Sequence, residues 1–189
     1  MEFTTRGLWT MLHGMGFGGL YLLAFTGALV ELYRTRLGDS LQADSDNSEF
    51  LRKYLAGMAV LAWLAVLSGA YIVYPWYRAA APAGTANLAA FPQALLQSSP
   101  STAQWHLLGM EWKEYVAWIA PISCTMAAAV ASGYGESLRS FPPLRAAVRN
   151  FVVISFFAAA LAGLTGAMLN KHAPVEGGRT VQVLRGSTQ

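Results

Sequence analysis

The 189-residue chain has few charged residues, a single cysteine and no cluster of basic residues. Charged residues make up 12% of the sequence, whereas soluble proteins carry about 25%. Hydrophobic residues make up 54%, which excludes intrinsic disorder, because disordered chains are poor in hydrophobic residues. The net charge of +3 is spread thinly along the chain, which excludes a nucleic-acid-binding protein that needs a basic face. Cys124 alone cannot form an internal disulfide or a multi-cysteine metal site.

Four apolar segments remain, and each is long enough for a membrane-spanning helix, which needs about 20 residues. They cover residues 8–32, 54–77, 105–132 and 151–169. Backbone polar groups within a membrane must be satisfied inside their own segment, so each segment is predicted to be a helix. The predicted fold class is all-α, an integral membrane four-helix bundle formed by residues 1–172. Residues 173–189 are predicted to form an extramembrane C-terminal tail.

The number of spans and the positions of the basic residues predict the orientation. An even number of spans places both termini on the same side of the membrane. The predicted loops 33–53 and 133–150 carry most of the basic residues, namely Arg34, Arg36, Arg52, Lys53, Arg139, Arg145 and Arg149. By the positive-inside rule these loops face the cytoplasm. Both termini are therefore predicted on the outer, periplasmic side of a bacterial-type inner membrane.

The connection 79–104 has no charged residue and lies on the predicted outer side. Its middle, residues 88–96, is predicted to be irregular, because Pro92 interrupts a helix. The alternative is a segment that lies on the membrane surface or against a partner.

The three histidines are all predicted near the same membrane face. His13 lies in the first span, about 7–8 Å below its start at 1.5 Å per residue. His106 opens the third span and His172 follows the fourth. An ionisable side chain within an apolar span is unfavourable unless it faces the bundle interior or a cavity and has a partner there. His13 is therefore the leading candidate for a ligand of a bound group.

Small residues lie beside His13 and on the fourth span. Gly14 and Gly18 are four residues apart and so lie on one helix face. Gly163 is at a matching position on the last span. These glycines either let helices pack closely or leave room for a flat group such as a porphyrin beside its axial imidazole.

With four spans, His13 beside Gly14 and Gly18, and a second histidine, His106, on another helix, the chain resembles small four-helix membrane cytochrome b subunits. The resemblance implies a b-type haem near the outer face, with His13 and His106 as axial ligands and Gly14, Gly18 and Gly163 around the ring. The chain departs from those cytochromes b in which histidines recur at both faces, so it predicts no second haem.

The same resemblance implies a non-catalytic electron-transfer subunit of a larger respiratory complex. Its partners would be membrane lipids, the other subunits, and either the quinone pool or a periplasmic redox protein such as a c-type cytochrome. Two alternatives stay open. One is a non-redox structural or assembly subunit, and the other is an outer-face copper or zinc protein in which His13, His106 and His172 bind the metal.

Two further features bear on these alternatives. Glu111, Lys113 and Glu114 lie near the start of the third span, where they are most simply residues that flank the membrane interface. They could also act near haem propionates or carry protons from a quinol. Cys124, close to Pro121, is predicted to be a packed thiol at a helix kink.

Overall fold

The computed structural model describes residues 4–37, 41–135 and 137–175, and every regular element in this part of the chain is a helix. Four helical segments of the described residues are long and apolar enough to cross a membrane: Thr5–Arg34, Ser48–Tyr77, Pro100–Tyr134 and Pro142–His172. Each contains one predicted span. This confirms the all-α architecture with four candidate membrane helices, and it indicates a multi-pass membrane protein.

The first two spans each include a π-helical segment, in which the turn is wider than in an α-helix. The first span consists of α1 (Thr5–Met11), the π-helical segment η1 (Leu12–Gly19) and α2 (Leu20–Leu37). The second consists of α3 (Leu41–Ser68), the π-helical segment η2 (Gly69–Val73) and α4 (Tyr74–Tyr77).

The third span is divided into several helices. It contains α6 (Pro100–Gln104), the π-helical segment η4 (Trp105–Met110), α7 (Glu111–Val116) and α8 (Ile119–Tyr134). Between α7 and α8 the α-helix is interrupted at Ala117 and Trp118. Pro121 has no N–H to donate to the carbonyl of Ala117, four residues earlier, which explains the interruption at this position.

The fourth span is α10 (Pro142–His172), which follows the short helix α9 (Ser137–Ser140). The predicted loops 33–53 and 133–150 were therefore too long. α2 continues to Leu37, α3 begins at Leu41, and α10 begins well before residue 151. Hydropathy detects only the apolar part of a helix, and Pro142 is at the first helical position, where its missing N–H leaves no bond unmade.

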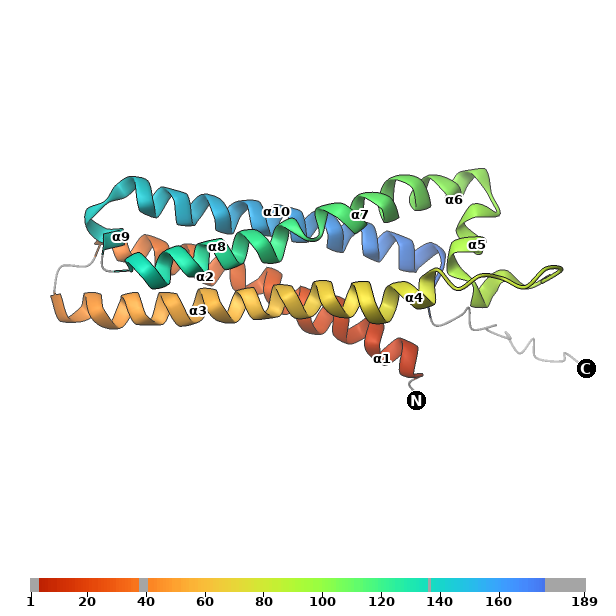
Figure 1. Ribbon diagram of the computed structural model, residues 1–189, viewed down its shortest axis with the longest axis horizontal. Coiled ribbons are helices and arrows are strands. Elements are labelled where there is room, and N and C mark those ends of the chain that lie inside the picture. The colour runs from red at the N-terminus through yellow and green to blue at the C-terminus, as the bar shows by residue number, and fades with distance from the viewer. Residues whose placement is uncertain (1–3, 38–40, 136, 176–189) are drawn as a thin grey trace, which may run out of the picture.

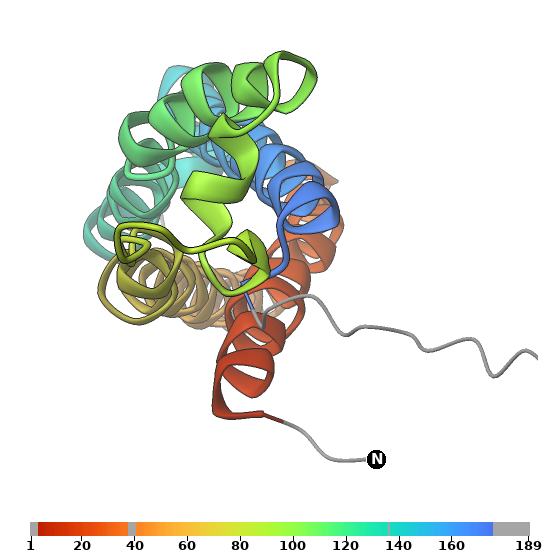
Figure 2. The ribbon, with the colours of Figure 1, turned by 90° about the vertical axis from the view of Figure 1, so that its right-hand side faces the viewer.

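The prediction that residues 88–96 are irregular was also wrong. The connection contains a 3₁₀ turn, η3 (Leu88–Ala90), and a helix, α5 (Pro92–Gln97). Pro92 begins this helix instead of interrupting it, since its fixed φ suits the first helical position. Figure 2 shows α5 lying across the end of the ring of long helices. Its Leu96 is fully buried there.

The four spans lie side by side along the length of the molecule (Figure 1). α8 packs against α3 and α10, and α2 packs against α3. Thr5 of α1 and His172 of α10 lie at the same end of the bundle, together with α4, α5 and α6 (Figure 1). The opposite end carries α9 and the start of α3. Residues 176–189, most of the predicted tail, lie outside the described residues.

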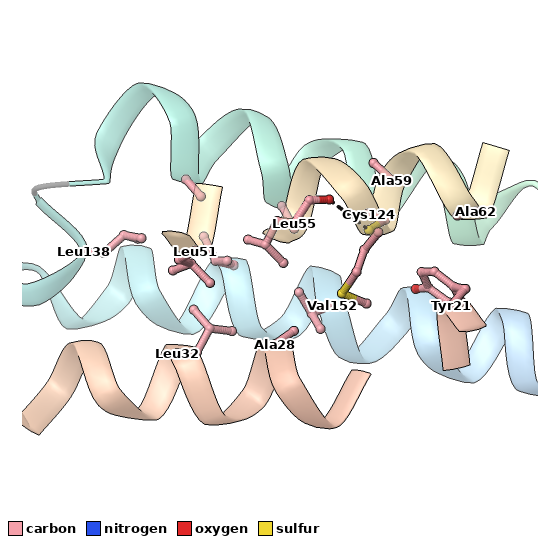
Figure 3. Packing of buried hydrophobic residues seen from close by; sticks show 14 residues of the cluster. Tyr21, Ala28, Leu32, Leu51, Leu55, Ala59, Ala62, Cys124, Leu138 and Val152 are labelled. Atoms are coloured by element: carbon pink, nitrogen blue, oxygen red, sulfur yellow. Dashed lines mark hydrogen bonds between the residues drawn. The ribbon is translucent and has the colours of Figure 1, made fainter. Parts of the chain in front are cut away.

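Two clusters of buried hydrophobic residues form the interior. The main core cluster lies between α2, α3, α8 and α10, and includes Leu55, Cys124, Ala127 and Val152 (Figure 3). Cys124 is fully buried, with its Sγ 3.9 Å from the carbonyl oxygen of Leu55, which confirms a packed thiol.

The second cluster, called the end cluster here, lies under α5 at the end of the bundle that carries Thr5 and His172. Its buried members are Tyr77, Leu96, Met110, Leu169, Ala173 and Val175. Ala173 and Val175, the first residues of the predicted tail, are thus packed against the helices.

Candidate functional site

A cavity of about 910 Å³ lies between the two clusters, within the bundle. Its wall includes Tyr21 of the main core cluster and Met110 of the end cluster. A volume of this size is in the range of small-molecule and cofactor sites, which is about 300–1,000 Å³. The cavity is therefore the candidate functional site.

Glycine and alanine make up a large part of the cavity wall. Gly14, Gly18 and Gly163, the three glycines predicted from the sequence, all line it. A methyl group built on Gly14 would meet no atom within 4 Å, and one on Gly163 would only touch the Leu22 side chain at 4.0 Å. These two glycines face open space and do not support a close contact between helices, as the packing interpretation would require.

All three π-helical segments of the described residues contribute to the cavity wall. η1 carries His13 and its neighbouring glycines, η2 carries Gly69, and η4 carries Met110. π-Helical turns occur often at functional sites, because the extra residue redirects side chains that an α-helix would place elsewhere.

His13 lies in the cavity wall, and its ring is held by the second span. Its Nδ1 lies 2.7 Å from the carbonyl oxygen of Ala65. A carbonyl can only accept a hydrogen bond, so Nδ1 carries the proton and donates it. The neutral ring then has an unprotonated Nε2 with a free lone pair. Nε2 forms no hydrogen bond with the described residues, and it is not among their fully buried unpaired atoms.

The absence of a side chain at Gly69 leaves the space that the His13 ring occupies. A methyl group built on Gly69 would lie 2.5 Å from Cε1 of His13 and 3.2 Å from its Nε2. Any residue larger than glycine would thus collide with the imidazole where it is held by Ala65.

The polar part of the cavity wall comes from α4 and α7. The Tyr74 hydroxyl donates a hydrogen bond of 2.5 Å to Oε1 of Glu114, and both residues line the cavity. Lys113 also lines it, with its Nζ against α10 at Gly166. Glu111 is exposed and does not line the cavity. The simplest prediction, that all three charged residues flank the interface, thus misses the inward position of Lys113 and Glu114.

A polar network forms the inner boundary of the cavity. The Ser155 hydroxyl lies 2.5 Å from the Tyr21 hydroxyl and donates to the carbonyl oxygen of Ala120 at 2.5 Å. Tyr21 and Ala120 line the cavity, whereas Ser155 is fully buried behind them. Tyr21 also belongs to the main core cluster, so the network joins the cavity wall to that cluster (Figure 3 shows Tyr21 beside the other cluster residues).

The structure does not bring His106 into the cavity wall with His13. His106 is buried in η4, and its Nδ1 forms a hydrogen bond of 2.7 Å with the Tyr77 hydroxyl. His172 lies elsewhere, stacked on Trp105 with ring centroids 5.8 Å apart. Within the described ranges, no group of three or more His, Cys, Asp or Glu side chains is placed to hold a metal ion. The predicted three-histidine copper or zinc site is therefore not assembled in the described part of the chain.

Sequence reasoning missed the Ala65 carbonyl and Gly69, and it ranked the inward position of Lys113 below a place at the membrane interface. Only Lys113 has a signal in the sequence, since a lysine within an apolar span usually faces the bundle interior. Comparison of the chain with protein-family models, with curated proteins and with solved structures gave no match.

Proposed function

We propose that the protein is the cofactor-holding membrane subunit of an electron-transfer complex, and that its cavity takes a b-type haem with His13 as an axial ligand. One observation carries this proposal. The Nδ1–H of His13 donates a hydrogen bond to the carbonyl of Ala65, which leaves the lone pair of Nε2 free to bind a metal in the cavity. Metal-binding histidines in proteins have this arrangement, in which the second ring nitrogen donates to a carbonyl and so fixes the ring and its tautomer.

The cavity wall also suits a large, flat and mainly apolar group. Glycines and alanines from η1, η2 and α10 leave room beside the imidazole. When bound, the haem would supply the one-electron chemistry. The protein would bind it, set its orientation and keep water from it.

The second axial ligand is proposed to be a methionine. Met11, Met15 and Met110 are among the residues that line the cavity, and histidine with methionine is a known axial pair. His106, the ligand implied by the resemblance to cytochrome b subunits, does not line the cavity, and its Nδ1 is hydrogen-bonded to the hydroxyl of Tyr77, a residue of the wall.

The place of the cavity bears on the partners. It is bounded by the end cluster, at the end of the bundle that carries Thr5 and His172. The basic residues gather toward the other end, which the positive-inside rule assigns to the cytoplasm. The cofactor would then lie near the outer face of an inner membrane, and it would exchange electrons with the quinone pool or a periplasmic c-type cytochrome.

A visible spectrum of the purified protein tests the proposal. We expect a reduced-minus-oxidised spectrum with the α and Soret bands of a b-type haem, at up to one haem per chain. A colourless protein that also fails to take up added haem would contradict the proposal. It would favour the alternative, a structural or assembly subunit whose glycines serve packing.

Replacing Gly69 with alanine should weaken haem binding without unfolding the bundle. The added methyl group would displace the His13 ring from the Ala65 carbonyl, and loss of such a supporting bond lowers metal affinity about 10- to 100-fold. Titration of the haem-free protein with haem measures this change.

Gly57→Ala is the matched control, because Gly57 lies on the same span, in α3, and a methyl group there meets nothing within 4 Å. Equal affinities for the two variants would show that the position of the imidazole does not matter.

A further inference from the structure

The side-chain amine of Lys113 lies inside the bundle with no hydrogen-bond or ion-pair partner among the residues that the structure describes. Lys113 lines the cavity, and a methyl group built on Gly166 of the facing helix α10 would lie 2.7 Å from its Nζ. Nζ makes no hydrogen bond or ion pair with any residue that the structure describes. A glycine thus makes room for this amine, but no side chain of the described residues neutralises it.

The acidic residues nearest in the chain do not serve as partners. Glu114 accepts the hydrogen bond of the Tyr74 hydroxyl. Glu111 is two residues away, and residues at this spacing do not face each other on a helix. Glu111 is also exposed. The cavity wall therefore presents one unpaired amine in apolar surroundings, where its charged form is costly unless an anion is bound beside it.

We infer that Lys113 is an anion-binding residue of the cavity, and that it pairs with a carboxylate of an otherwise apolar ligand. The inference rests on the proposed function, under which that ligand is a porphyrin with free propionates. His13 and Lys113 then form two separate anchors. His13, packed against Gly69, binds the metal, whereas Lys113, packed against Gly166, binds the acid.

The two anchors can be tested separately with metal-free protoporphyrin IX and its dimethyl ester. The free acid can pair with Lys113 and the ester cannot, while neither has an iron for His13 to bind. Fluorescence titration of the haem-free protein in neutral detergent measures both affinities. We expect the native chain to bind the free acid about tenfold more tightly than the ester, as for a charge-assisted hydrogen bond.

Lys113→Met should remove this preference and leave the affinity for the ester unchanged. Lys171→Met is the matched control, because Lys171 is exposed and lies outside the cavity wall. It should behave as the native chain does. Equal binding of acid and ester by the native chain would overturn the inference. So would a Lys113→Met variant that loses acid and ester alike, since that result would mean a structural role for the lysine.

Two further measurements distinguish failure of this inference from failure of the proposed haem-binding function. His13→Ala should leave the ratio of acid to ester unchanged, so the carboxylate anchor can hold even if no haem spectrum is found. Oleate and methyl oleate test a lipid as the source of the carboxylate. If oleate displaces protoporphyrin at oleate concentrations well below the dissociation constant of the porphyrin, the ligand is a lipid and the porphyrin assignment is overturned.

Discussion

His13→Gly should abolish the b-type spectrum of the purified protein, and added imidazole should restore it. The substitution removes the only histidine in the cavity wall of the described residues, and with it the proposed axial nitrogen. Free imidazole can enter the space left by the side chain and supply the same nitrogen. The Ala65 carbonyl would then accept a hydrogen bond from a ring that is not attached to the chain. Loss and rescue are read from the Soret band at increasing imidazole concentrations.

His172→Gly is the matched control for this experiment. His172 is exposed and stacks on Trp105 outside the cavity, so its loss should leave the spectrum intact with or without imidazole. A band that survives in His13→Gly would assign the iron to another residue. A band that is lost but not rescued, in a protein that keeps its helical circular dichroism and elution volume, would also contradict ligation by His13.

Ala127→Leu should lower the free energy of unfolding by about 3 kcal/mol, near the upper end of the range for overpacked cores. Ala127 is fully buried in the main core cluster, on α8, which packs against both α3 and α10. Membrane helices gain little from the hydrophobic effect when they associate, so close contact between small residues contributes much of their stability. Three additional carbon atoms at this position would force the helices apart.

Ala129→Leu separates packing from helix propensity. Ala129 lies two residues further along α8 and is exposed. Alanine and leucine have similar helix propensities, so the exposed substitution should change stability by less than about 0.5 kcal/mol. Both free energies can be measured by titrating the folded protein with dodecyl sulfate while following helical circular dichroism. Similar losses in the two variants would mean that α8 does not pack as described.

The sequence alone predicts the four candidate membrane helices, because length and hydropathy are local properties of each segment. It predicts helix ends less well. Pro92 shows why: the same residue interrupts a helix from within and begins one from its first position. The choice between these outcomes depends on residues distant in the chain, such as the end cluster that buries Leu96.

The candidate site was predictable only in part. An imidazole within an apolar span pointed to His13, and the neighbouring glycines pointed to open space beside it. The haem itself stays a prediction. The interaction of His13 with the Ala65 carbonyl joins residues 52 positions apart, and no local pattern encodes a backbone acceptor. The π-helical segments also redirect side chains away from the positions that regular helical spacing would assign to them.

The network of Tyr21, Ser155 and Ala120 has a consequence for energy conversion under the proposed function. Tyr21 belongs both to the cavity wall and to the main core cluster, so the network lies at the boundary between the cavity and the part of the bundle filled by Leu55, Val152 and their neighbours. A redox centre held on one side of that boundary would accept and release electrons at a single surface of the bilayer. Turnover of such a subunit would not be electrogenic, because it would move no charge through the membrane. The midpoint potential of its redox centre would respond little to the transmembrane voltage.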